Sequence, residues 1–111
     1  MVKQGTIIKI NFNPQSGHEK AGYRPAVVIS NDIFNEKARL SIVCPITNTN
    51  NDFPLHVPLD TRTKTTGVIL CEHIKALDLN SRTYQVIENL PKDILQNVID
   101  IVYSEIEQIE D

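Results

Sequence analysis

Hydrophobic residues follow a two-residue repeat along the first three quarters of this chain. Residues 6–12 alternate, with Ile8, Ile10 and Phe12 on one face, which is the pattern of a half-buried β-strand. Five further short segments rich in β-branched or apolar residues predict strands at 24–30, 40–46, 55–59, 67–74 and 84–87. Pro58 places the third of these segments at a sheet edge, because proline donates no ladder hydrogen bond.

The spacing changes after residue 90. Apolar residues then recur every three to four positions, with acidic residues mostly on the other face: Ile94, Val98, Ile101, Val102, Ile106 and Ile109. Pro91 fits the first turn of a helix, and Asp93 is favourable toward the helix dipole. We therefore expect five or six short strands followed by one C-terminal helix, with a turn or short helical passage at 31–35. Short strands separated by frequent turns favour a small β-barrel.

The 111 residues are enough for one domain, which we expect to span residues 1–111. No apolar run approaches the ~18 residues of a membrane span, and the first residues lack the apolar stretch of a signal peptide. Cys44 and Cys71 lie inside apolar segments, which predicts reduced, buried thiols in a cytoplasmic protein. The histidines and cysteines show no metal-site spacing, so we expect no metal.

The net charge of −3 conceals an uneven distribution. Residues 1–84 hold ten Lys/Arg and seven Asp/Glu, a net of +3, whereas residues 85–111 hold one Lys and seven acids, a net of −6. An acidic total argues against a nonspecific nucleic-acid binder, but the first three quarters are mildly basic.

Two loops carry most of the candidate chemistry, in a chain without a Walker motif, a nucleophile elbow or a dinucleotide fingerprint. In the first loop, His18 and Glu19 can move protons, and Arg24 just beyond it can grip a phosphate with two hydrogen bonds. In the second, Thr47 closes a strand and Asn48 can pair with a base edge. Both loops are also compatible with ordinary surface and turn chemistry.

Three blocks in register resemble the MazF/PemK family of toxin endoribonucleases. The first is Gly17-His18-Glu19-x-x-Gly22-x-Arg24-Pro25-Ala26-Val27-Val28. The second is Pro45-Ile46-Thr47, which resembles the strand end before the family's variable loop. The third is the segment 67–78, Gly-Val-Ile-Leu-Cys-Glu-His-Ile-Lys-Ala-Leu-Asp. Together with the trailing helix, the resemblance covers nearly the whole chain.

The resemblance implies a mainly β fold, a small SH3-like β-barrel of the CcdB/PemK kind with a C-terminal α-helix, working as a homodimer. It implies the toxin component of a type II toxin–antitoxin system, a growth-inhibiting mRNA interferase. Such an enzyme cleaves single-stranded RNA at specific sequences without metal or cofactor, leaving 2′,3′-cyclic phosphate and 5′-hydroxyl ends. It also implies a cognate antitoxin that occludes the active surface.

Family position assigns the main catalytic roles to Arg24 and Thr47. Arginine suits the charged phosphorane, because its guanidinium is planar, permanently charged and bidentate. His18 and Glu19 are the candidates for the acid and base, and their roles stay open. We expect RNA contacts from Lys20 in the first loop.

Three more residues are expected to contact RNA: Asn48, Phe53 and Glu72. Phe53 can stack a base, although core packing beside Pro54 is an equal alternative. Glu72 falls where relatives such as the toxin Kid carry a catalytic Asp, but the Arg that precedes that Asp is Leu70 here. A structural salt bridge is the alternative for Glu72. His56 and His73 are expected to be packed or exposed rather than catalytic.

Two other functions compete with the nuclease. One is a toxin of the CcdB kind that acts on DNA gyrase, and the other is an inactive SH3-like binding module. The 17–24 block favours the nuclease over the CcdB-like toxin, which does not need it, and the presence of Arg24 and Thr47 speaks against the inactive module. We further expect RNA to meet the barrel face while the acidic helix faces away from it.

Overall fold

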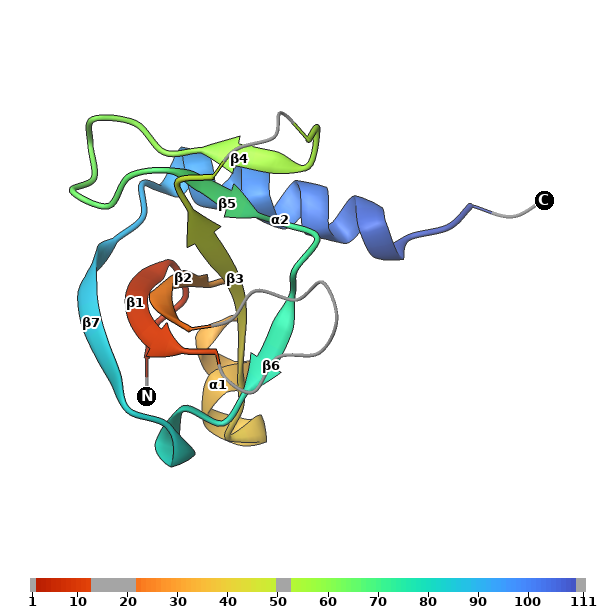
Figure 1. Cartoon of the computed structure of the whole chain (residues 1–111). Helices are drawn as coiled ribbons and strands as arrows, with labels where there is room; N and C mark the ends of the chain where they lie inside the picture. The colour runs from red at the N-terminus through yellow and green to blue at the C-terminus, as the bar shows by residue number, and fades with distance from the viewer. Residues whose placement is uncertain (1, 13–21, 50–52, 110–111) are drawn as a thin grey trace.

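A computed structural model describes residues 2–12, 22–49 and 53–109 of the chain. These residues form seven strands, two α-helices and one 3-10 turn (Figure 1). The strands are β1 (Thr6–Asn11), β2 (Tyr23–Val28), β3 (Ser41–Thr47), β4 (His56–Pro58), β5 (Val68–Leu70), β6 (Lys75–Leu77) and β7 (Tyr84–Asn89). The helices are α1 (Asp32–Ala38) and α2 (Lys92–Ile106), and the 3-10 turn η1 spans Leu79–Ser81.

The strands pair antiparallel in the order β4-β5-β3-β2-β1-β7, and β6 pairs with β3 beside this path. The mainly β class with a C-terminal helix is therefore confirmed. No pairing joins β4 to β7 among the described residues, so the sheet is bent but open, where we expected a closed small barrel. Pro58 lies in β4 at one end of this order, as its missing N–H predicts.

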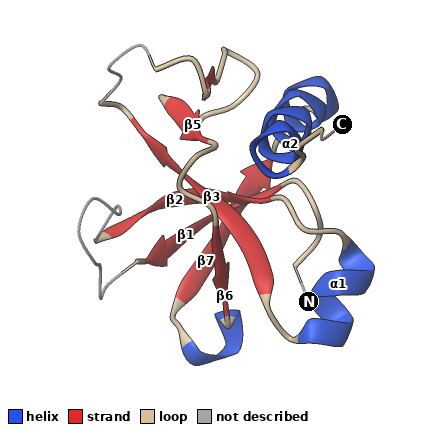
Figure 2. Ribbon diagram, turned by 90° about the vertical axis from the view of Figure 1, so that its right-hand side faces the viewer, coloured by secondary structure: helices blue, strands red, loops and turns tan. Residues whose placement is uncertain are grey.

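The core has two parts, one on each face of the sheet. Alternation in β1 divides its side chains between them: Ile7 joins the cluster that packs against α2, whereas Ile8 and Ile10 join the cluster on the other face. All three are fully buried. Figure 2 shows α2 lying along one side of the strands, and Ile94 and Val98 are its buried contacts. Each such side chain contributes about 1.5–3 kcal/mol of burial.

Helix α2 is only partly covered by the sheet. It begins after Pro91, as the sequence predicts, and its first turns pack well. Ile106 and Ile109 are 74% and 85% exposed, so the prediction that they continue the buried face is wrong. The reason is visible in Figure 1, where the C-terminal end of α2 extends past the strands that cover its beginning. No helix among the described residues has the length and apolarity needed to cross a membrane.

The segment 67–74, predicted as one strand, is interrupted by a turn. β5 ends at Leu70, and the N–H of His73 donates to the Leu70 carbonyl at 3.1 Å. β5 pairs with the C-terminal end of β3, and β6 pairs with its N-terminal end. The turn between them brings Glu72 and His73 to one place on the sheet margin.

The two cysteines are buried and unpaired, as the sequence predicts. Burial, followed by the charges of Glu105 and Glu72, raises the pKa of Cys71 to about 12. Burial likewise raises the pKa of Cys44 well above its ordinary value. Both thiols are therefore protonated at neutral pH.

The loop between β4 and β5 is held against the rest of the fold by charge. Glu88 on β7 accepts hydrogen bonds from the N–H of Lys64 and from the N–H and hydroxyl of Thr65, at 2.8–3.1 Å. Arg62 bridges Asp60 in the loop and Asp93 in the first turn of α2. Burial opposes ionisation of Glu88, but these hydrogen bonds outweigh it and lower its pKa.

We predict that Glu88→Gln destabilises the fold by about 1 kcal/mol at pH 7, the value of a partly screened, charge-assisted hydrogen bond. Because the folded-state pKa of Glu88 is lowered, its stabilisation is present above the ordinary glutamate pKa and is lost as pH falls through the folded value. Urea unfolding at pH 7 and pH 3 measures this.

Glu105→Gln is the contrasting variant, because burial and then the charge of Glu72 raise the pKa of Glu105. It is expected to leave stability at pH 7 unchanged or slightly increased. A Glu88→Gln deficit that persists undiminished at pH 3 would contradict the assignment.

Candidate active site

Arg24 and Thr47 come to the same end of two neighbouring strands. The β2–β3 register pairs Ala26 with Pro45 and Val28 with Val43. Continued by two residues, it places Arg24 level with Thr47, on the same side of the sheet as Ala26. Ala26 belongs to the core cluster on the face away from α2. By alternation, Arg24 and Thr47 therefore belong to that face as well. On its other side, Arg24 pairs with Ile10 of β1.

Thr47 is held in a defined orientation. Its residue is only 7% exposed, and its Oγ1 accepts a hydrogen bond from the N–H of Thr49 at 3.2 Å. A hydroxyl that accepts one bond still has a proton to donate. The side chain is therefore suited to donating a hydrogen bond to an oxygen atom of a ligand.

Gly67 allows β5 to approach Thr47 closely. Its φ is +113°, and a Cβ built on it would lie 2.2 Å from the carbonyl oxygen of Thr47. Thr47 pairs with Val68, the next residue, so this contact lies at the start of β5. Any side chain at position 67 would push the end of β3 away from β5, and the reactive end of the strand would move.

Asn48 directly follows Thr47 and is exposed to solvent. The hydroxyl of Thr66 donates to Oδ1 of Asn48 at 3.0 Å, which orients the amide. The NH₂ group of Asn48 is then directed away from Thr66, where a base can meet it. Asn48 is exposed, so no backbone rearrangement is needed for that contact.

Glu72 lies between two histidines that come from different parts of the chain. Nε2 of His56 on β4 is 2.8 Å from Oε2 of Glu72, and Nε2 of His73 is 3.8 Å from the same oxygen. The His56 side chain is only 6% exposed, so the expectation that it is packed is confirmed. Glu72 is hydrogen-bonded to His56 and close to His73, and no salt bridge of Glu72 with Lys75 or Arg82, the partners that the sequence suggested, is found among the described residues.

Phe53 stands next to this group. Its ring meets that of His56 edge to face, with centroids 5.4 Å apart and planes at 73°. Phe53 is 43% exposed, so it is not a core residue as one alternative held. An exposed aromatic ring with a fixed edge contact is a surface on which a base can stack.

The acidic helix is not wholly separate from these residues. Burial, followed by the charge of Glu72, raises the pKa of Glu105, which lies in the last turn of α2. The two carboxylates are therefore within electrostatic reach of each other. The expected separation between the acidic helix and the candidate RNA contacts is incomplete at this point.

His18, Glu19 and Lys20 lie outside the described residues, so their roles stay predictions. Sequence reasoning missed the contact of His56 with Glu72 and the contacts of two cations. The Lys9 ammonium lies 5.3 Å from the ring centre of Tyr23, and Arg82 donates to the Asn11 carbonyl at 2.9 Å. Lys9 lies in the middle of the predicted strand 6–12 and Arg82 just before the predicted strand 84–87, so neither position signalled such a contact.

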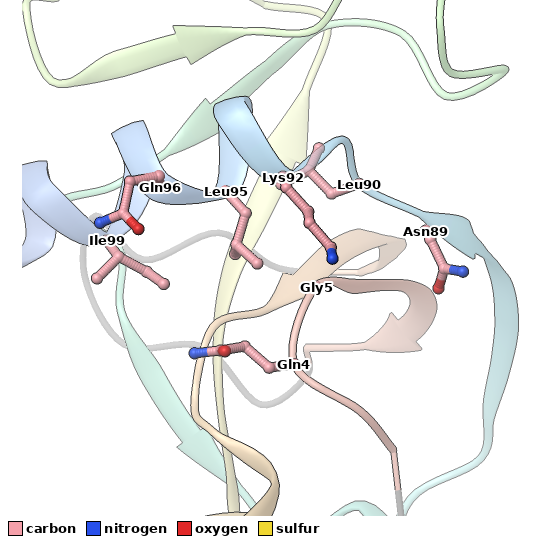
Figure 3. A pocket seen from close by; sticks show the side chains of 8 residues that line it. All are labelled: Gln4, Gly5, Asn89, Leu90, Lys92, Leu95, Gln96 and Ile99. Atoms are coloured by element: carbon pink, nitrogen blue, oxygen red, sulfur yellow. The ribbon is translucent and has the colours of Figure 1, made fainter.

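A pocket of about 430 Å³ opens elsewhere, between the N-terminal segment, the end of β7 and the start of α2 (Figure 3). Its lining residues are Gln4, Gly5, Asn89, Leu90, Lys92, Leu95, Gln96 and Ile99. Lys92 is its single titratable side chain, so the pocket does not bring together groups for acid–base chemistry.

Comparison with known proteins places the chain among toxins. A family model described as PemK-like, MazF-like toxin of type II toxin-antitoxin system matches residues 3–104. The chain is 30% identical to Endoribonuclease PemK of Escherichia coli over 102 residues, covering 88% of the chain and 77% of that protein. It is 32% identical to Endoribonuclease EndoA of Bacillus subtilis over 103 residues, covering 88% of each.

Solved structures of toxins from this family have folds similar to that of this chain. MazF from Deinococcus radiodurans has a TM-score of 0.87 at 34% identity, with 94% of each chain covered. A MazE–MazF structure from the same organism has a TM-score of 0.81 at 34% identity, again over 94% of each chain. A mycobacterial endoribonuclease in complex with its cognate antitoxin shares the fold, with a TM-score of 0.80 at 13% identity, over 98% of this chain and all of that one.

We predict that Gly67→Ala destabilises the fold by about 2–3 kcal/mol, because the new Cβ collides with the Thr47 carbonyl and strains the backbone. Gly22→Ala is the matched control. It also has a positive φ, of +84°, but an added Cβ would meet no atom of the described residues within 4 Å. Gly22→Ala should therefore cost about 1 kcal/mol. Equal losses in urea unfolding would show that the Thr47 contact does not matter.

Proposed function

This chain is an endoribonuclease toxin that belongs to the PemK-like, MazF-like family of type II toxin–antitoxin systems, and we propose that its reaction centres on Arg24 and Thr47. The observation that carries the proposal is the β2–β3 register, which brings these two side chains to one end of the sheet. The relatives named endoribonucleases support it. They also argue against a gyrase-directed toxin or an inactive module.

The reaction uses the nucleophile that RNA supplies. The 2′-oxygen forms a bond to phosphorus and loses its proton to a base, while the bond from phosphorus to the 5′-oxygen breaks. The 5′-oxygen takes a proton from an acid, which leaves a 2′,3′-cyclic phosphate and a 5′-hydroxyl. Arg24 stabilises the charge that develops on the phosphorane oxygens, and the Thr47 hydroxyl donates to one of them.

The reaction also needs a general base for the 2′-hydroxyl and a general acid for the 5′-oxygen. We assign them to His18 and Glu19, because imidazole and carboxylate exchange protons near neutral pH, whereas guanidinium and hydroxyl do not. Metal and cofactor have no step in this mechanism.

RNA binding extends from the reacting pair along the neighbouring loops. We assign Asn48, Phe53, Glu72 and Lys20 to it. The orientation of the Asn48 amide by Thr66 and the exposed Phe53 ring support these roles. The net charge of +3 on residues 1–84 is small, so a few placed contacts carry the binding, and its salt dependence is shallow.

The partners follow from the family. MazE–MazF structures among the neighbours support a cognate antitoxin that covers the active surface. We propose that residues 1–111 act as a single domain, that the protein is a homodimer, and that it works in the cytoplasm, where its mRNA substrate is.

We predict that Arg24→Ala and Thr47→Ala each lower the rate of cleavage of single-stranded RNA by at least about 100-fold, the effect of losing one transition-state donor. Lys37→Ala and Thr61→Ala, matched changes at exposed positions on α1 and in the 59–67 loop, should retain the native rate. Gel analysis of end-labelled RNA measures all four. Full activity of folded Arg24→Ala would refute the assignment.

We also predict that cleavage continues at an unchanged rate in excess EDTA, because the 2′-hydroxyl attack needs no metal-bound water. The same time course with and without chelator is the measurement. A reaction that stops in EDTA and returns with Mg²⁺ would exclude this mechanism.

A further inference from the structure

The Glu72 carboxylate is only half satisfied. Both neighbouring histidines approach Oε2, at 2.8 Å from His56 and 3.8 Å from His73. Oε1 is buried and has no hydrogen-bond partner among the described residues. A buried acceptor without a donor costs about 1–3 kcal/mol, and native proteins rarely retain one without a reason. A ligand that supplies the donor is such a reason.

The carboxylate is held firmly enough to select its ligand. His56 lies on β4, its backbone pairs with Leu70 of β5, and its side chain is almost fully buried. Glu72 follows β5 by two residues, so the hydrogen bond to His56 ties it to the same strand pair. A fixed acceptor of this kind discriminates between partners, because its position does not adapt to a wrong one.

An exposed aromatic ring contacts His56, the histidine that is hydrogen-bonded to the carboxylate. Phe53 contacts His56 edge to face, and 43% of its surface is open. Aromatic rings that are anchored but exposed bind unpaired bases by stacking, worth about 1–3 kcal/mol per base. An aromatic ring close to a hydrogen-bond acceptor can bind a base by stacking, while the acceptor selects the base by the donors on its edge.

The group is within reach of RNA bound at the reacting pair. Thr47 pairs with Val68, and Glu72 lies four residues farther on, which is at most about 13 Å, because the chain turns after Leu70. Phe53 lies on the segment that leaves Thr47 and returns to β4. RNA held at Arg24 and Thr47 can therefore place a neighbouring base here.

We propose that Glu72 is a specificity-determining residue, whose carboxylate, on a side chain that is 26% exposed, accepts a hydrogen bond from the exocyclic amino group of one RNA base stacked on Phe53. The inference rests on the proposed function and names part of its substrate. Adenine, cytosine and guanine carry such an amino group. Uracil presents its one N–H between two carbonyl oxygens, which a carboxylate repels. This position of the recognition sequence therefore excludes uracil.

The surroundings favour a base edge over a phosphate. Burial, followed by the charge of Glu72, raises the pKa of Glu105, so the two carboxylates interact. The negative charge of Glu72 itself repels the RNA backbone and attracts N–H donors. No group of three or more His, Cys, Asp or Glu side chains in the described ranges is arranged to hold a metal ion.

The test maps cleavage ends on a single-stranded RNA pool with random sequence. We expect the native protein to disfavour uracil at one position near the cut by about 10-fold, within the range of one base contact. Glu72→Gln should admit uracil there, because an amide also donates to a carbonyl oxygen, and preferences elsewhere should stay unchanged. Glu105→Gln removes the same charge nearby and should leave the preference intact.

A second measurement separates this inference from the nuclease assignment. A random single-stranded DNA pool presents the same base edges but has no 2′-hydroxyl, so it is bound without being cut. Thymine, which has the carbonyl oxygens of uracil, should be depleted at one position in the DNA that the native protein selects, and this depletion should vanish in Glu72→Gln.

Glu72→Asp keeps the carboxylate on a side chain that is one methylene shorter. It provides a second test if Glu72→Gln does not fold. It should weaken the preference without reversing it. A uniform loss of cleavage for all sequences in Glu72→Gln, with preferences unchanged, would assign Glu72 to catalysis and overturn the proposal. Unchanged preferences at an unchanged rate would overturn it too. Native protein that selects DNA as expected but cuts no RNA would refute the proposed reaction and leave the base contact standing.

Discussion

The pairing of one strand, β3, with three others determines where every described site residue lies. β2 runs along one side of β3 and brings Arg24 level with Thr47. β5 and β6 share the other side, one at each end. The chain turns between β5 and β6, and Glu72 lies at that turn. The positions of Thr47 and of the histidine–carboxylate group thus both depend on the pairing of β3.

Much of this arrangement could be predicted from the sequence, and the reason is local. The alternation in residues 6–12 predicted β1 and the face that buries Ile8 and Ile10, although it did not predict that Ile7 is buried on the other face or that the pairing with β7 shifts at this point. Helix α2 has a proline at its start and a regular apolar repeat, and it begins where expected. Arg24 and Thr47 were chosen by resemblance and not by geometry, and continuing the β2–β3 register is compatible with that choice.

The rest depended on contacts between distant segments, which no local pattern encodes. The turn after Leu70 carries no glycine or proline, and Glu72 and His73 fit the alternating pattern of a half-buried strand, so the sequence shows no break there. His56 and Glu72 are 16 positions apart, and their hydrogen bond exists only because β4 pairs with β5. The exposure of Ile106 depends on where the sheet ends, and an apolar repeat in a helix carries no information about that.

The reactivity of the two buried cysteines can report how often this part of the fold opens. Cys44 lies on β3, and Cys71 follows β5, so both thiols are covered by the strand pairing that supports the site. Their raised pKa and complete burial leave the folded state unreactive toward alkylating reagents. Labelling can then proceed only through molecules in which β3 and β5 have separated, and its rate reports the free energy of that separation. The labelling rate of Cys44, which lies on the same strand as Thr47, thus measures how often β3 separates from its neighbour.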